Sequence, residues 1–132
     1  MSYFERHYTL EEARGELPFL RSHFQRIHEL IALLKQRQME MERIQVLIAS
    51  NGYASRHPDY GEVVGELQKR VQEITDKGIE IKDIERGLID FPHWREGEEV
   101  FLCWLYGEAD IEFWHTLEDG FGGRTPLSHT NI

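Results

Sequence analysis

The sequence predicts an α+β fold in which a long antiparallel helical hairpin packs with a small antiparallel β-meander. Apolar residues recur every three or four positions through most of residues 1–78, which is the spacing of a helical stripe that faces a core. From Ile79 onward, apolar and polar residues alternate, which is typical of strands. Because 132 residues suffice for one domain, we expect a single domain over residues 1–132, with the hairpin in 1–78 and the β region in 79–132.

A long first helix is expected to begin after Thr9, because Thr9 and Glu12 form a capping box. Pro18 lies too far inside this helix to be its starting residue, so it should kink the first turns or divide them from the rest. Asn51 and Gly52 both tolerate the left-handed backbone conformation and mark the end. The apolar stripe has the heptad-like spacing of a coiled coil, and it includes Leu10, Ala13, Leu17, Leu20, Phe24, Ile27, Ile31, Leu34, Met41 and Ile48.

A second, shorter helix is expected after a loop at residues 52–61. Asp59 and Glu62 can cap its start, and Gly78 ends it. At 1.5 Å per residue, about 40 residues of the first helix extend roughly 60 Å, whereas about 17 residues of the second cover only roughly 25 Å. We therefore expect a homodimer through the long helix; the alternative is that the C-terminal sheet covers the remaining stripe.

The β region opens with two short strands. Residues 79–82 alternate between apolar and charged side chains, and residues 87–91 form a second strand that Pro92 is expected to close. Residues 95–98 have the composition of a turn.

Two further strands complete the predicted meander. Residues 99–106 are apolar on both faces, the pattern of a central strand that is covered on each side. Aromatic and β-branched residues at 111–116 predict the last strand, with a short helix over 109–118 as the competing interpretation. A glycine-rich tail follows.

The charge and cysteine content limit the classes of function. Residues 78–132 carry 12 acidic against 4 basic residues, within a total net charge of −9. This balance argues against nucleic acid and favours a cation or a basic protein partner, or simply keeps the protein soluble. A single cysteine and the lack of any long apolar run predict a cytoplasmic protein that does not contact a membrane.

One candidate metal set consists of Glu108, Glu112, His115 and Asp119. If these residues were helical, all four would fall on one face, and Glu112-x-x-His115 would match half of the carboxylate–histidine spacing of di-iron bundles. A divalent metal is the cofactor this implies. If the segment is a strand, His115 is instead a histidine of the core or its boundary.

A second candidate set would bind a small ligand through Asp90, Glu108, His115 and Arg124, in a pocket among the aromatic residues of the C-terminal region. The alternative is that Arg124, at the end of the glycine-rich segment, pairs with a nearby acid such as Asp90 or Asp119. We expect Cys103, inside an apolar strand, to be an inert packing residue.

Several short motifs resemble the bacterial domain-of-unknown-function family 2203. They comprise Tyr8-Thr9-Leu10-Glu11-Glu12-Ala13, Leu17-Pro18, Ile79-Glu80-Ile81-Lys82-Asp83, Arg86-Gly87-Leu88-Ile89-Asp90-Phe91-Pro92, Leu102-Cys103-Trp104, Gly107-Glu108, Trp114-His115, Gly120-Phe121 and Gly123-Arg124-Thr125-Pro126. The resemblance covers nearly the whole chain and implies no particular activity.

Two classes of function remain open. The first is a non-catalytic interaction or scaffold module that dimerises through its long helix. The second is a small-ligand or metal-binding protein or enzyme, with its site in the acidic, aromatic-rich C-terminal region.

Overall fold

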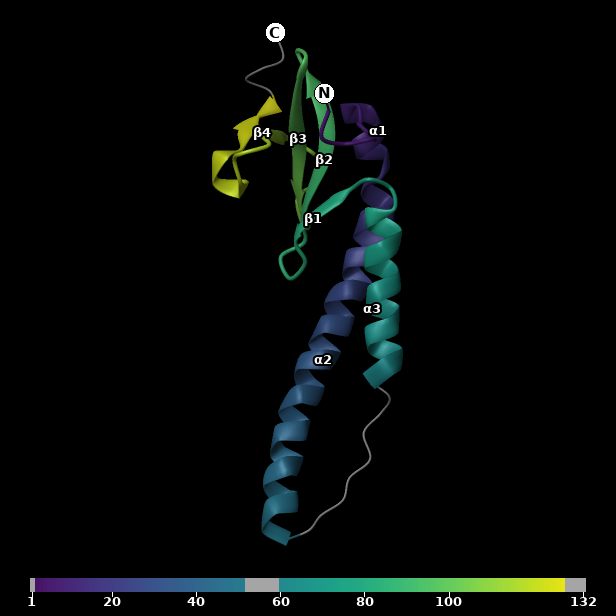
Figure 1. The fold of residues 1–132 in the computed structure, drawn as a ribbon, viewed down its shortest axis with the longest axis vertical. Coiled ribbons are helices and arrows are strands. Elements are labelled where there is room, and N and C mark those ends of the chain that lie inside the picture. Colours follow the sequence, from purple (N-terminus) through teal and green to yellow (C-terminus); the bar gives the residue numbers. More distant parts are fainter. Residues whose placement is uncertain (1, 52–59, 128–132) are drawn as a thin grey trace.

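The computed structural model describes the backbone of residues 2–51 and 60–127 and the side chains of residues 2–38 and 61–127. Helices come first and a five-stranded antiparallel sheet follows, so the α+β class is confirmed (Figure 1). The elements are α1 (Leu10–Gly15), α2 (Leu17–Asn51), α3 (Tyr60–Thr75), β1 (Glu80–Asp83), β2 (Leu88–Arg95), β3 (Glu98–Leu105), β4 (Phe113–Thr116), η1 (Phe121–Gly123) and β5 (Thr125–Pro126). Within these residues, no helix has both the length and the apolar character needed to cross a bilayer.

The first helical segment is divided near its start. The capping box at Thr9 is present, since the Thr9 hydroxyl accepts from the backbone N–H of Glu12 and the Glu12 carboxylate accepts from that of Thr9. Glu16 separates α1 from α2, so Pro18 is the second residue of a new helix, where its missing N–H costs little. Of the expected ends, Asn51 is the last residue of α2, whereas the cap at Asp59 lies outside the described residues.

Helices α2 and α3 lie side by side, and α2 extends well beyond the sheet (Figure 1). The Arg26 guanidinium on α2 donates to both carboxylate oxygens of Glu66 on α3, at 2.8 and 2.9 Å. The two helices differ greatly in length, with 35 residues in α2 and 16 in α3.

The strands follow each other in space in the order of the sequence, β1-β2-β3-β4-β5, as expected for a meander. The turn between β2 and β3 is tight, with positive φ at both Glu96 (51°) and Gly97 (83°). Two positive φ values in a row match the right-handed twist of the flanking strands.

The expectation that Pro92 closes the second strand is wrong, because β2 continues to Arg95. Within a strand, the C=O and N–H of one residue point to the same side. The Pro92 carbonyl accepts from the backbone N–H of Tyr8 at 2.7 Å, so its ring nitrogen also faces the N-terminal segment. The missing N–H therefore costs the ladder between β2 and β3 no hydrogen bond.

The strand expected in the last part of the chain is confirmed as β4. A helix over 109–118 is wrong, because residues 113–116 form β4 and pair with β3; this strand begins two residues later than predicted. After the glycine-rich segment, Thr125 and Pro126 form a further strand, β5, and pair with Trp114 and Phe113.

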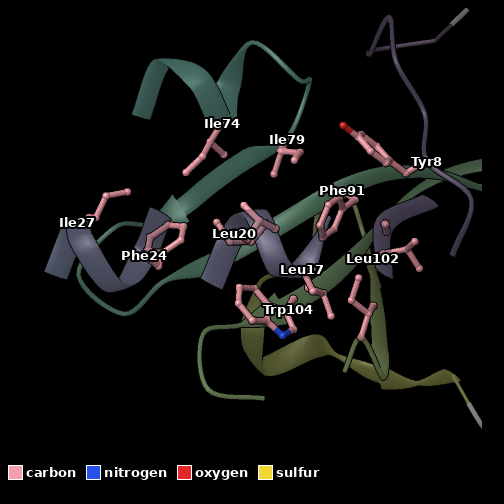
Figure 2. Close-up of a cluster of buried hydrophobic side chains, with 13 residues drawn as sticks. Tyr8, Leu17, Leu20, Phe24, Ile27, Ile74, Ile79, Phe91, Leu102 and Trp104 are labelled. Atoms are coloured by element: carbon pink, nitrogen blue, oxygen red, sulfur yellow. The ribbon is translucent and has the colours of Figure 1, made fainter. Parts of the chain in front are cut away.

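The main hydrophobic core lies between α2 and one face of the sheet. Figure 2 shows Phe91, Leu102 and Trp104 of the sheet against Leu17, Leu20 and other side chains of α2. Ile74 and Ile79 close this core from the end of α3 and the start of the β region.

Candidate functional site

The sheet face that points away from this core is buried as well. Residues alternate between the faces of a strand, so Phe101 and Cys103 of β3 lie opposite Leu102 and Trp104. Both are nearly inaccessible, at 2% and 0% exposure. An antiparallel sheet commonly leaves its second face in water. The expectation that the strand at 99–106 is covered on each side is thus confirmed.

The N-terminal segment and Lys82 of β1 help to cover this second face. The ring of Phe4 packs against that of Phe101, with 5.3 Å between centroids. The backbone N–H groups of Tyr3 and Phe4 donate to the Glu99 carboxylate, which fixes this segment in place. The Lys82 ammonium of β1 also packs on Phe101, with its Nζ 4.4 Å from the centroid of the ring.

The register of three strands brings Asp90, Cys103 and His115 together on this face. Asp90 of β2 pairs directly with Cys103 of β3. Cys103 also pairs with Phe113 of β4, and His115, two residues further along, lies on the same face. The potential ligand atoms of the three side chains all lie within 4.8 Å of one another, and all three residues are buried.

The imidazole of His115 is held at both nitrogens. Its Nδ1 lies 2.7 Å from the carbonyl oxygen of Thr116; because a carbonyl only accepts, Nδ1 carries a hydrogen. Nε2 lies 3.0 Å from each carboxylate oxygen of Asp90. Burial by itself lowers the pKa of His115, but the hydrogen bonds to Asp90 and Thr116 outweigh burial and the pKa is raised.

Cys103 is a thiol in this environment and a poor nucleophile. Its burial, and then the neighbouring Asp90 carboxylate, raise the pKa of the thiol far above its usual value. This fits the inert residue predicted from the sequence as far as nucleophilic attack is concerned. The raised pKa does not exclude Cys103 as a metal ligand, because a metal cation that binds a thiol removes its proton.

The predicted ligand set of Asp90, Glu108, His115 and Arg124 forms two separate pairs. The Arg124 guanidinium donates to Glu108 at 2.6 Å, so its partner is neither Asp90 nor Asp119. The second Glu108 oxygen accepts from the backbone N–H of Leu105 at 2.8 Å.

Aromatic rings hold Arg124 in place. Its guanidinium carbon lies 3.8 Å from the centroid of Phe113 and 4.5 Å from that of Phe121. Arg124 and Phe121 thereby attach the C-terminal segment beside the strand that carries His115.

The predicted metal set of Glu108, Glu112, His115 and Asp119 does not converge. Glu112 and Asp119 are exposed, and Glu108 is engaged by Arg124. His115 lies in β4 and Glu112 directly precedes that strand, whereas the proposed grouping required both residues to be helical. The nearest carboxylate to His115 comes instead from Asp90, 25 residues away.

A surface pocket of about 400 Å³ lies elsewhere, between the start of α2 and the segment after β3. Arg21, Gln25, Tyr106 and Glu108 are among its lining residues. Of the four predicted ligand-binding residues only Glu108 lines it, so this pocket is distinct from the cluster of Asp90, Cys103 and His115.

The sequence carries a signal for part of this cluster, although no linear motif contains it. Asp90 interrupts the apolar residues of its strand, and such an isolated polar residue in a buried strand must find a partner on a neighbouring strand. Only the register, which the residue spacing does not give, shows that Asp90 lies beside Cys103 and His115.

No curated protein and no solved structure matches this chain. A family model described as "Uncharacterized conserved protein (DUF2203)" matches residues 6–127. The match spans every described helix and strand. The chain therefore belongs to the DUF2203 family.

Proposed function

We propose that this protein binds a divalent transition-metal ion between Asp90 and His115, on the sheet face opposite the helices. The observation that carries this proposal is the buried cluster itself, in which a carboxylate, an imidazole and a thiol converge from three strands.

The His115 ring supports this role. A histidine that binds a metal usually donates its other N–H to a carbonyl or carboxylate, which fixes the tautomer and the orientation of the ring. The Nδ1–H of His115 donates to the Thr116 carbonyl, and Nε2 points at Asp90.

The spacing of the donor atoms also suits a metal ion. Two ligands that each lie about 2.1 Å from a tetrahedral ion stand roughly 3.4 Å apart. Nε2 of His115 and the Asp90 oxygens are 3.0 Å apart, so an ion between them requires these side-chain atoms to move apart by only about 0.4 Å.

The test is a titration of chelator-treated protein with zinc and cobalt salts, followed by calorimetry and thermal unfolding. We expect one equivalent to bind; an ion at 100 times its dissociation constant adds about 2.7 kcal/mol to the free energy of unfolding. Asp90→Asn should abolish this effect, whereas Glu112→Gln and Asp119→Asn serve as matched controls because these carboxylates are exposed.

Two results would overturn the proposal. One is a failure of the unaltered protein to take up either ion. The other is an equal loss of binding in the control variants. Circular dichroism shows whether Asp90→Asn folds, and the measurement on the unaltered protein stands regardless of that variant.

A second candidate function is an interaction module in which the hairpin of α2 and α3 forms a homodimer. At 1.5 Å per residue, the 35 residues of α2 extend about 52 Å and the 16 residues of α3 about 24 Å, so α3 covers less than half of α2. The heptad-like spacing continues through Met41 and Ile48 in the part beyond α3.

Light scattering coupled to gel filtration tests this second function. We expect twice the chain mass at micromolar concentration, and a shift to monomer in the double variant Met41→Glu, Ile48→Glu. Gln36→Glu on the exposed surface of α2 is the control. A monomeric unaltered protein would exclude the dimer.

For either function we place the protein in the cytoplasm, where the free thiol of Cys103 stays reduced.

A further inference from the structure

We infer that Cys103 is the third ligand of the proposed site and binds as a thiolate, so that the site takes a zinc-class ion (Zn²⁺ or Co²⁺) and rejects Mg²⁺ and Ca²⁺. This inference rests on the proposed function, because it names the class of ion that the Asp90–His115 site would hold.

The position of Cys103 is the first support. It is the direct cross-strand partner of Asp90, its side chain lies on the face that carries His115, and it is wholly inaccessible to solvent. An ion that contacts both Asp90 and His115 is therefore within reach of the sulfur, since the ligand atoms lie within 4.8 Å of one another.

The balance of charge is the second support. A divalent ion held by Asp90 carboxylate, Cys103 thiolate and neutral His115 gives a site with no net charge. A buried site with an uncompensated charge is costly, because the surroundings cannot solvate it. If Cys103 stayed a thiol, the same ion would leave one positive charge unbalanced between the strands.

The set of donors is the third support. Magnesium and calcium require six or more oxygen ligands from carboxylates, carbonyls and water. Sulfur and imidazole nitrogen are instead typical ligands of zinc and related ions. In the described part of the chain, the cluster offers one carboxylate beside a sulfur and a nitrogen.

Binding exchanges protons for the ion. Before binding, the Nε2–H of His115 donates to Asp90, and Cys103 carries a proton on sulfur. The ion forms bonds to Oδ of Asp90, Nε2 of His115 and Sγ of Cys103; the S–H bond breaks, and both protons leave to solvent. The oxidation state of no atom changes.

Cobalt provides a direct test, because a Co²⁺–thiolate bond gives an intense near-ultraviolet charge-transfer band that nitrogen and oxygen ligands do not give. Cys103 is the only cysteine in the chain, so such a band can come from no other residue. We expect the band on addition of CoCl₂ to the chelator-treated full-length protein. Zinc should displace it, and a large excess of MgCl₂ or CaCl₂ should not.

The variant Cys103→Ser keeps the size of the side chain and removes the sulfur. This variant should lose the band and bind zinc at least about tenfold more weakly. Removing even a residue that only hydrogen-bonds to a metal ligand weakens metal binding by that factor, so the loss of a ligand should cost at least as much. Ser22→Ala is the control variant, because Ser22 is exposed and lines the surface pocket, away from the cluster. It should leave both the band and the zinc affinity unchanged.

The outcomes separate the two claims. Cobalt that binds without the band, with an affinity unaffected by Cys103→Ser, overturns the inference and leaves the Asp90–His115 site standing. No uptake of cobalt or zinc overturns the proposed function and this inference together. Displacement of the cobalt by magnesium or calcium overturns the assigned class of ion.

Discussion

Replacement of Gly87 by alanine tests the close approach between the β1–β2 turn and the end of β3. Gly87 has φ of +74°, and a Cβ atom built there would lie 2.5 Å from Cβ of Tyr106. This contact is hard to relieve, because a Cβ atom moves only with its backbone, and Tyr106 N–H donates to the Gly87 carbonyl at 2.9 Å. Gly97 provides the matched control, since its φ of +83° is similar but nothing lies within 4 Å of its Cβ position.

The expected magnitude follows from two costs. A left-handed conformation costs alanine about 1–2 kcal/mol, and reduced freedom of the unfolded chain returns about 0.4–1 kcal/mol of this. Gly97→Ala should therefore lower the free energy of unfolding by about 1 kcal/mol. Gly87→Ala bears the same cost and an overpacking cost of about 1–3 kcal/mol, for a total of about 2–4 kcal/mol.

Urea unfolding followed by tryptophan fluorescence measures both values, with circular dichroism as a second probe. In thermal unfolding, each kcal/mol should correspond to roughly 3–4 °C in Tm for a chain of this size. The reasoning is refuted if the two variants lie within 0.5 kcal/mol of each other, a limit set by the usual accuracy of such comparisons. The turn would then not approach Tyr106 as closely as described.

Three further predictions concern the core, the C-terminal segment and pH. Trp104→Ala should lower the free energy of unfolding by about 3–5 kcal/mol, because a fully buried indole is removed; an effect below 1 kcal/mol in urea unfolding would contradict its place in the core. Arg124→Met should expose the segment after β4 to limited proteolysis, whereas Glu108→Gln should have the smaller effect because its amide oxygen still accepts from the Leu105 N–H. Burial, and then the charge of Arg70, lower the pKa of His23 in the folded protein. As the pH drops through about 6.5, the unfolded chain therefore takes up a proton at His23 before the folded protein does, and the free energy of unfolding should fall. His23→Gln should flatten that part of the stability curve, and an unchanged curve would show that His23 does not contribute.

The sequence by itself determined the α+β class and most of the elements. Some features depend only on residues that are close in the sequence, so a local pattern predicts them directly. They are the capping box at Thr9, the change of spacing at Ile79 and the two apolar faces of residues 99–106. The sequence also named Asp90 and His115 as candidate ligands, together with Glu108 and Arg124, because these polar residues lie among the aromatic residues of the C-terminal region.

Tertiary structure alone decided how those residues combine. The β2–β3 and β3–β4 registers place Asp90 beside Cys103 and His115, and a shift of either register by one residue would turn these side chains to opposite faces. Pro92 inside β2 is tolerated because its ring nitrogen faces away from β3, toward the N-terminal segment, so the ladder between β2 and β3 loses no hydrogen bond. Such contacts join residues far apart in the chain, and their energies depend on packing that residue spacing does not encode.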